Sequence, residues 1–502
     1  MGEDLTQVRA RFNGSLRIES RPERLSGEAG GSILREIIER VGLLPWLLAR
    51  LKDPRKPELI THPFSELLVT TVLLIALGWR DRDDADALRN DPVMRLIVSE
   101  RRGIAALLSP PKDPGQPPDR NPAVPDGLAS QPTLSRLVAT LSTASNRAVL
   151  HESLLEVAAR RVRASREGHR LRYVSVDLDS LPIEVYGEQP GSEYNGHYHA
   201  RIFHPLVCSV AETGDLLDAV LREGTAHTAE GGLEFLLPLL DRIEEKLCQV
   251  ASVRIDAGFP SEKFLGGLEQ RHRPTPYVAR IKNNPVLDRM AAPLLHRPVG
   301  RPPQEPRTWF HEMTYQAESW SRPRRVVLVV LERPRGDQEQ RRQEEMFLHH
   351  FWLITSWTQE QMSGEALLAL YRERGTAEGH QGELKSVLDP ALSSSPRPKS
   401  TYRGQPPKRQ RPAKPVDSFA NNETLLLLNL LAYNILHVAR VLLETSTHEG
   451  WSLKRLRERL LRVPARVLLH GRRAVLVIGE AAAHLWHHLW RKLAGFEAIP
   501  SS

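Results

Sequence analysis

The spacing of the apolar residues changes twice along this 502-residue chain, and the changes restrict the folds that it can adopt. From about 31 to 165, apolar residues recur at helical spacing, interrupted by a proline-rich loop at 109–127. The pattern then becomes β-rich, and helical spacing returns after a basic, proline-rich segment at 393–415. We therefore expect a helical N-terminal region, a central region that contains a sheet, and a helical C-terminal region.

The central region predicts an ordered series of strands and helices. Its segments are, in order, strand-like 173–187, 199–212 and LLDAVLREG, helical 229–247, strand-like 248–256, helical 261–271, and strand-like 277–283. Three further strand-like runs follow, TWFHEMTYQAESW, RRVVLVVLERP and FLHHFWLITSW, and then a helix at 361–386. This order predicts an α+β core with a β-rich insertion ahead of the last helix.

The charge and the cysteines narrow the class of protein. Lysine and arginine number 69 against 61 aspartates and glutamates, a net charge of +8, which favours a polyanionic partner over an acidic small substrate. Cys208 and Cys248 lie outside any C-x-x-C spacing, so we expect a reducing cytoplasm and no disulfide scaffold or zinc ribbon. The apolar runs at 67–79 and 425–443 predict buried core helices rather than membrane spans.

Acidic residues stand at two predicted strands. Asp177 and Asp179, in VDLDS, share one face of a strand because successive side chains alternate. Asp256 ends the apolar run VASVRID, at the carboxyl end of another strand, where α/β sheets usually carry their sites. A small carboxylate cluster is the usual way to hold Mg²⁺ or Mn²⁺ for phosphoryl transfer. The alternative is that Asp177 and Asp179 are solvent-facing strand residues.

The predicted helix at 361–386 contains the stretch YRERGTAEGHQGELK. At about 100° per residue, its Tyr371, Arg374, Glu378 and Lys385 fall within roughly a 60° sector. Glu378 could complete the carboxylate cluster, Arg374 and Lys385 could contact phosphates, and Tyr371 could donate a hydrogen bond or stack. The alternative is an ordinary ion pair between Arg374 and Glu378 on a solvated helix face.

Three glycines interrupt the same stretch, at Gly375, Gly379 and Gly382. Each costs about 1 kcal/mol relative to alanine inside a helix, so the solvated-face alternative gives no reason for them. Gly375 and Gly382 lie on or near the charged stripe and could let a sugar–phosphate backbone approach closely. The competing explanation is close packing of the helix against the sheet.

The stripe residues follow the spacing Y-(2)-R-(3)-E-(6)-K, which resembles the signature of bacterial insertion-sequence DDE transposases. The stretch is most similar to the group called transposase DDE domain group 1. Other segments also resemble that group: LASQPTLSRL (128–137), DLDS to VYG (177–187), HPLVCSVAETGD (204–215), RIDAGF (254–259) and NNETLLLLNLLAYNILHVAR (421–440). The resemblance therefore runs over most of the chain.

The resemblance implies an RNase H-like, retroviral-integrase-like catalytic core, with a β-rich insertion ahead of the glutamate helix. It implies that two aspartates and a glutamate bind Mg²⁺ or Mn²⁺, two ions in all. Carried over to this chain, the second aspartate is Asp256 and the glutamate is Glu378. Related motifs read D-x-T, which favours Asp179 as the first aspartate, with Asp177 as the alternative. Tyr371, Arg374 and Lys385 are the implied DNA-binding residues.

The implied activity is that of a DNA transposase, which cleaves at element ends and transfers strands into target DNA by a cut-and-paste DDE mechanism. Its partners would be double-stranded DNA with terminal inverted repeats, target DNA, and a second copy of the chain in the synaptic complex. It would work in the bacterial cytoplasm, on the nucleoid. Trp320 is a candidate to stack on a flipped base, with an ordinary strand tryptophan as the alternative.

Two other functions remain open. The family commonly has threonine two residues after the first aspartate, whereas this chain has Leu181, so it could be an impaired relative that binds element ends as a regulator. An RNase H-like nuclease is the third reading. The predicted boundaries are a helical N-terminal DNA-binding region at 1–165, the first part of the core at 166–283, the β-rich insertion at 284–358, the core helix at 359–392, the linker at 393–416, and a helical C-terminal region, a candidate for dimerisation, at 417–502.

Overall fold

The computed structural model describes most of the chain. The described residues are 3–4, 11–16, 18–101, 103–108, 127–164, 171–297, 299, 305–332, 348–393 and 417–496. The two proline-rich segments expected from the sequence lie outside this set, except for Gly127 and Ser393. The chain forms two compact units, one of residues 1–146 and 435–502 and the other of residues 147–434.

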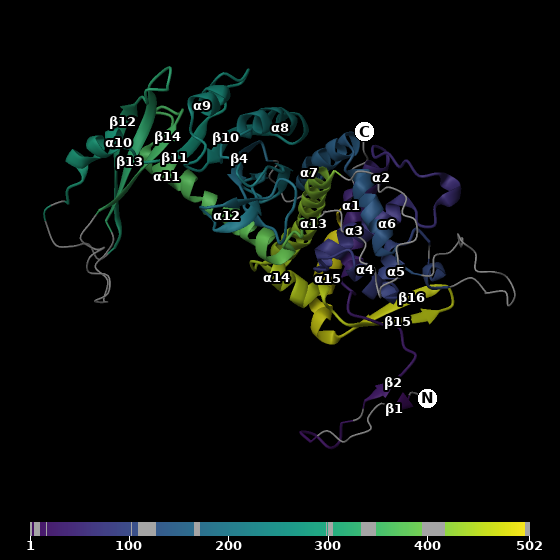
Figure 1. The fold of residues 1–502 in the computed structure, drawn as a ribbon. Coiled ribbons are helices and arrows are strands. Elements are labelled where there is room, and N and C mark those ends of the chain that lie inside the picture. The colour runs from purple at the N-terminus through teal and green to yellow at the C-terminus, as the bar shows by residue number, and fades with distance from the viewer. Residues whose placement is uncertain are drawn as a thin grey trace. The chain divides into compact units, whose positions relative to one another are not determined.

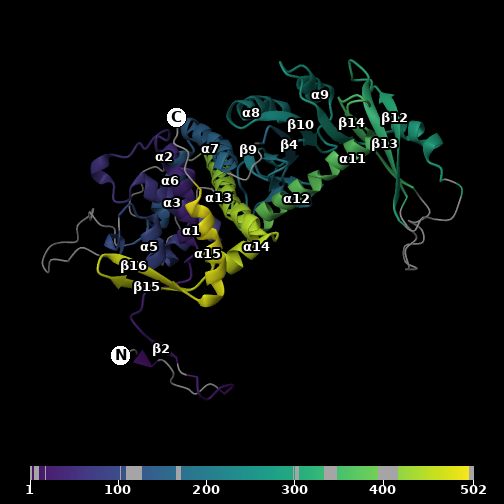
Figure 2. The same ribbon diagram turned by 180° about the vertical axis from the view of Figure 1, so that it is seen from behind.

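The first unit is mainly helical. Its elements include α1 (Gly31–Val41), α2 (Leu43–Leu48), α3 (Phe64–Leu77), α4 (Asp84–Ala87), α5 (Pro92–Val98), α6 (Gln131–Leu141), α14 (Leu453–Leu456), α15 (Glu480–Ala494) and a three-stranded sheet of β3 (Leu25–Ser26), β15 (Ala465–His470) and β16 (Arg473–Ile478) (Figure 2). The buried Arg457 donates hydrogen bonds to the carbonyls of Ile75 and Ala76, at the end of α3. Segments from both ends of the chain therefore share one core.

The second unit is built on a large mixed sheet. Among the described residues its strand order is β12 (Arg307–Tyr315), β13 (Arg324–Glu332), β14 (His349–Thr355), β11 (Tyr277–Ile281), β10 (Gln249–Ile255), β4 (Tyr173–Ser180), β8 (Leu206–Val210) and β9 (Leu216–Val220). Strands β4, β10 and β11 run parallel to one another, and the other pairs are antiparallel. The carboxyl ends of β4 and β10 therefore lie side by side.

Helices cover both faces of this sheet (Figure 1). On one face, α7 (Ala144–Ala164), α8 (Gly232–Lys246), α9 (Glu262–Glu269) and α10 (Pro285–Ala291) contribute apolar residues to a large core. On the other, α11 (Gly364–Arg372) buries Leu367 and Leu368 against Val278, Val327 and Leu353. Because side chains alternate along a strand, neighbours such as Val326 and Val327 serve opposite cores.

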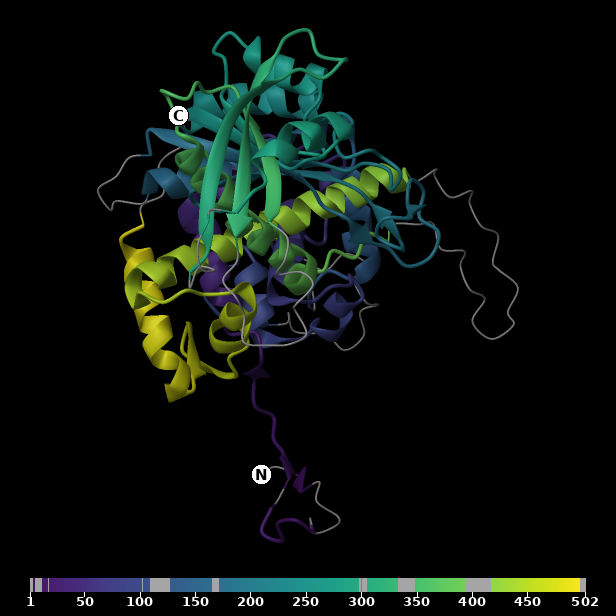
Figure 3. The same ribbon diagram turned by 90° about the vertical axis from the view of Figure 1, so that its left-hand side faces the viewer.

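The strands and helices predicted between 173 and 283 form in the predicted order, but the strand-like 173–187 and 199–212 each divide into two strands. Their parts β5 (Ile183–Glu184) and β7 (Ala200–Phe203) form a separate three-stranded sheet with β6 (Glu193–Asn195), which was not predicted. The segment LLDAVLREG forms β9, the helical 229–247 forms α8, and the strand-like 277–283 forms β11. The three strands expected in the insertion also form, as β12, β13 and β14 (Figure 3). They extend the main sheet, because β14 pairs with β11 along Val278 to Ile281.

The two apolar runs form buried helices, as predicted. The run at 67–79 lies mostly in α3, which is buried on nearly every side, and its Thr70 and Thr71 hydroxyls donate to carbonyls of the same helix. The run at 425–443 lies in α13 (Ser418–Thr447). Of the described helices, α13 alone is long and apolar enough to cross a membrane, and 89% of its most apolar window is buried inside the protein.

Candidate active site

Two carboxylates meet where β4 and β10 end. Asp179 lies near the end of β4, and Asp256 directly follows β10. The parallel register pairs Arg254 with Asp177 and Ile255 with Leu178, so the next position on β10 places Asp256 beside Asp179. The structure thus brings together two of the residues that the sequence singled out.

Both β4 aspartates are buried, so the solvent-facing alternative is wrong. Asp177 is 1% exposed and Asp179 is 9% exposed. They share one face of β4, as expected, but the opposite face, with Val176 and Leu178, is buried as well. Helices on both sides of the sheet leave no strand face for solvent here.

Burial raises the pKa of Asp179 to about 6, because the ionised carboxylate loses its hydration. The nearby Arg374 opposes this increase, whereas the negative charges of Asp256 and Glu378 add to it, and the N–H of Ser180 stabilises the charged form. Asp179 therefore lies within electrostatic reach of both other predicted ligands.

Arg374 joins the predicted glutamate helix to strand β4. Its Nη2 donates to Asp179 Oδ2 at 2.6 Å, and its Nη1 donates to Glu378 Oε1 at 2.5 Å. The ion pair with Glu378 does form, as the alternative interpretation required, but the same guanidinium also reaches a buried aspartate 195 residues away in sequence. The Glu378 side chain remains 58% exposed.

The helix differs from the predicted one. It begins at Gly364 rather than 361, is interrupted at Glu373, continues as α12 (Arg374–Glu383), and ends in a π-helical turn, Leu384–Leu388. The four stripe residues therefore occupy three helical segments rather than one continuous α-helix.

Tyr371 and Lys385 still lie near the carboxylates. Desolvation raises the pKa of Tyr371, with Arg374 opposing and Asp256 adding to the increase. Desolvation also lowers the pKa of Lys385, while the charge of Asp179 opposes that decrease. All four residues of the predicted stripe thus interact electrostatically with Asp179 or Asp256.

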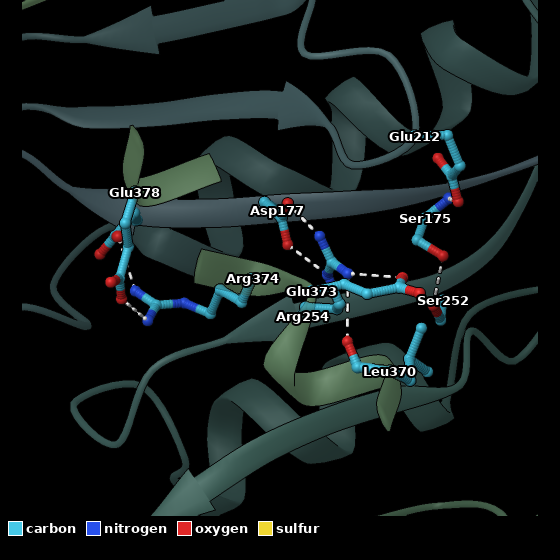
Figure 4. Close-up of polar contacts among 10 residues, drawn as sticks. Ser175, Asp177, Glu212, Ser252, Arg254, Leu370, Glu373, Arg374 and Glu378 are labelled. Carbon is cyan, nitrogen blue, oxygen red and sulfur yellow. Dashed lines mark hydrogen bonds and ion pairs between the residues drawn. The ribbon is translucent and has the colours of Figure 1, made fainter. Parts of the chain in front are cut away.

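Asp177 has a different partner from Asp179. Its two carboxylate oxygens accept hydrogen bonds from Nε and Nη2 of Arg254, both at 2.6 Å, and both side chains are 1% exposed (Figure 4). Burial raises the pKa of Asp177, and Arg254 opposes the increase. This bidentate ion pair occupies both oxygens of Asp177, which favours Asp179 as the first metal ligand.

The sequence interpretation missed several residues around the site. Arg254 was one, although its position two residues before Asp256 in RIDAGF was a usable signal. Tyr198 was another, and its pKa is raised by burial, with Asp179 and Asp256 adding to the effect. His204 was a third: it is 4% exposed, its Nδ1 donates to the Ala226 carbonyl, and its Nε2 has no hydrogen-bond partner among the described atoms.

The three carboxylates suit a hard divalent cation by their chemistry, since Mg²⁺ and Mn²⁺ prefer oxygen ligands. As the side chains stand, no group of three described His, Cys, Asp or Glu residues surrounds one ion position. The Arg374 guanidinium contacts both Asp179 and Glu378. A cation that bound both Asp179 Oδ2 and Glu378 Oε1 would have to displace Arg374.

The three helix glycines face open space. No described atom lies within 4 Å of a Cβ built at Gly375, Gly379 or Gly382, beyond the neighbouring helix backbone, and all three are exposed. The explanation by close packing against the sheet is therefore wrong. Trp320, in contrast, is only 7% exposed and packs edge-on against Tyr315, which favours the ordinary structural tryptophan over a base-stacking residue.

Comparisons with known proteins identify a family. The family model described as transposase DDE domain group 1 matches residues 8–397. The solved structure titled "Cryo-EM structure of piggyBac transposase synaptic complex with hairpin DNA (SNHP)" is similar over 94% of this chain and 86% of that chain, at 11% identity and a TM-score of 0.39. No curated protein matches.

Proposed function

The chain belongs to transposase DDE domain group 1 and is a DNA transposase, and from this premise we propose that Asp179, Asp256 and Glu378 are its catalytic carboxylates. The observation that carries the proposal is the double ion pair of Arg374 with Asp179 and Glu378. It brings the helix stripe onto the strand-borne aspartates, as a DDE centre requires.

We also propose that the core is RNase H-like. The strand that bears the first aspartate, β4, is central, with the antiparallel β8 and β9 on one side and the parallel β10 and β11 on the other. The second aspartate follows the adjacent parallel strand. This arrangement supports an RNase H-like assignment, within which β12, β13 and β14 correspond to the β-rich insertion.

Asp179, Asp256 and Glu378 would hold Mg²⁺ or Mn²⁺, two ions in the proposed mechanism. Such ions, when bound, make water a better nucleophile and neutralise charge on the phosphate that is attacked. In the proposed mechanism Arg374 leaves the carboxylates and binds a DNA phosphate, for which its planar guanidinium is suited. Lys385 and Tyr371 contact the same strand.

The proposed reaction is cut-and-paste transposition. Double-stranded DNA with terminal inverted repeats and target DNA are the substrates, and two copies of the chain assemble in the synaptic complex, in the bacterial cytoplasm. Leu181 does not argue against activity, because its side chain is 1% exposed and packs in the core. Its presence in place of threonine removes no carboxylate from the site.

The test is cleavage of a duplex that carries the inverted repeat flanking the gene. With Mg²⁺, the full-length chain should cut at the repeat boundary, and a chelator should stop cleavage without releasing the DNA. Binding without cleavage would identify the regulator instead. Cutting that follows DNA structure and ignores the repeat would identify the nuclease.

A further inference from the structure

We infer that Arg254 is a positioning residue. Its guanidinium keeps the helix that bears Glu378 interrupted at Glu373, between α11 and α12, and this interruption directs α12, with Glu378, toward the aspartates. Only the expected effect of Arg254 on catalysis rests on the proposed function. The structural part of the inference concerns the free protein and can be tested without DNA.

The contacts of Arg254 join the sheet to the helix (Figure 4). Arg254 lies near the end of β10 and is 1% exposed. Two of its nitrogens donate to Asp177 on β4, and the third, Nη1, donates to the Leu370 carbonyl at 3.1 Å and lies 3.3 Å from Glu373 Oε2. One buried side chain on β10 thus contacts β4 and the end of α11.

The contact with Leu370 explains the interruption of the helix. In an uninterrupted α-helix the Leu370 carbonyl would accept the N–H of Arg374, four residues later. Instead α11 ends at Arg372, α12 begins at Arg374, and the Leu370 carbonyl accepts a hydrogen bond from Arg254. Insertion of a side chain into the helical hydrogen-bond ladder is a recognised cause of helix kinks.

The position of the interruption matters for the site. Arg374 directly follows the break, and Glu378 lies four residues further on. A change in the direction of α12 would therefore move Glu378 relative to Asp179. A misplacement of about 1 Å can reduce catalysis on the order of 10²-fold.

A competing explanation is that Arg254 only stabilises the sheet as a buried ion pair. The chain offers a matched control for this. Arg161 donates two hydrogen bonds to Asp215, and the two side chains are 6% and 1% exposed, similar to the pair of Arg254 and Asp177. These hydrogen bonds join α7 to Asp215, the residue before β9, and neither partner lies on α11 or α12.

Substitution of Arg254 by lysine distinguishes the positioning role from a purely stabilising ion pair. Arg254→Lys keeps the positive charge beside Asp177, but a single ammonium cannot reproduce the fork that serves Asp177 and Leu370 together. Arg161→Lys makes the same chemical change in the control pair. A second variant, Arg254→Met with Asp177→Leu, replaces the ion pair with apolar residues, a change that buried pairs often tolerate.

The direct experiment measures the direction of α12 in the free, full-length chain. Spin labels at Lys263→Cys on α9 and Ser386→Cys in the π-helical turn, in a Cys248→Ser background, report the distance between the sheet layer and the far end of the helix. We expect Arg254→Lys and the apolar double variant to shift or broaden this distance distribution, and Arg161→Lys to leave it unchanged. An unchanged distribution in both Arg254 variants would overturn the inference.

The catalytic consequence is measured on inverted-repeat DNA at saturating concentration. Arg254→Lys should cut on the order of 10²-fold more slowly than the wild type, with an unchanged Kd for DNA. Arg161→Lys should cut at the wild-type rate when each protein is assayed at the same interval below its own melting temperature. Wild-type cleavage by a chain whose label distance has shifted would overturn the positioning role. A wild-type chain that does not cleave would instead contradict the proposed function and leave the label result standing.

Discussion

Asp177 and Asp179 stand two positions apart on the same face of one strand, yet their partners give them different roles. Asp177 forms a bidentate ion pair with the buried Arg254, whereas Asp179 meets Arg374 from the helix and the negative charge of Asp256. The sequence could not separate the two, because alternation along β4 treats them alike. The register with β10, a non-local feature, decides between them.

This division predicts different defects for the two alanine variants. Asp177→Ala removes the bidentate partner of the buried Arg254 guanidinium and leaves two of its nitrogens without their acceptor, which should lower the free energy of unfolding by about 3–5 kcal/mol. Asp179→Ala removes a carboxylate whose charged form burial already disfavours, so it should keep the wild-type melting temperature and lose cleavage. Thermal melts and cleavage assays of both variants check this. A wild-type melting temperature for Asp177→Ala would contradict the structural role.

At the scale of elements, local periodicity predicted most strands and helices because periods of 2 and 3.6 are written in neighbouring residues. The interruption at Glu373 was not predictable in this way. It depends on Arg254, which is 119 residues away in sequence. The joining of the two chain ends was also missed, because it depends on contacts such as Gly30 N–H to the Leu461 carbonyl.

The exposed glycines of α12 lead to a prediction about that helix. Gly382→Ala should stabilise the free protein by up to about 1 kcal/mol, because alanine is the better helix former and its Cβ would meet open space. If DNA approaches this face, the added methyl group should also reduce cleavage. Melts of the free protein and cleavage assays measure the two effects.

Gly266→Ala on α9 is the matched control for Gly382→Ala. A Cβ there would meet only ordinary contacts at 3.9 Å, so this variant should also be stabilised but should cleave normally. Destabilisation of Gly382→Ala before DNA is added, or equal cleavage by both variants, would count against DNA contact at α12.

The contact between α7 and β9 predicts a pH dependence of stability. Burial lowers the pKa of His151, but the hydrogen bond at 2.6 Å to Asp218 and the negative charges of Asp218 and Glu423 together outweigh it, so the pKa is raised above 6.5. The folded state therefore binds this proton more tightly than the unfolded state. The resulting stabilisation is fully present below pH 6.5 and is lost as the pH rises through the folded pKa.

Melting temperatures measured from about pH 6, just below the ordinary histidine pKa of about 6.5, up to about pH 9 test this prediction. The wild type should lose stability across the range more steeply than His151→Gln, which cannot be protonated. If the melting temperatures of the two proteins changed in parallel with pH, the pair of His151 and Asp218 would not contribute to the pH dependence of stability.

At the scale of the whole molecule, the net charge of +8 correctly favoured a polyanionic partner but could not name its contacts. Lys385 is one proposed contact. Lys385→Ala should weaken binding to inverted-repeat DNA and reduce the slope of log K against log salt by about one. Titrations at several salt concentrations measure that slope. An unchanged slope would remove Lys385 from the DNA interface.

The central claim is that three carboxylates from β4, the end of β10 and α12 hold metal for DNA cleavage rather than read DNA. The most direct measurement compares binding and Mg²⁺-dependent cleavage of the same inverted-repeat duplex by Asp256→Ala and Glu378→Ala. We predict that both variants bind the DNA nearly as the wild type does and that neither cleaves it. Retained cleavage, or a loss of binding equal to the loss of cleavage, would contradict the claim.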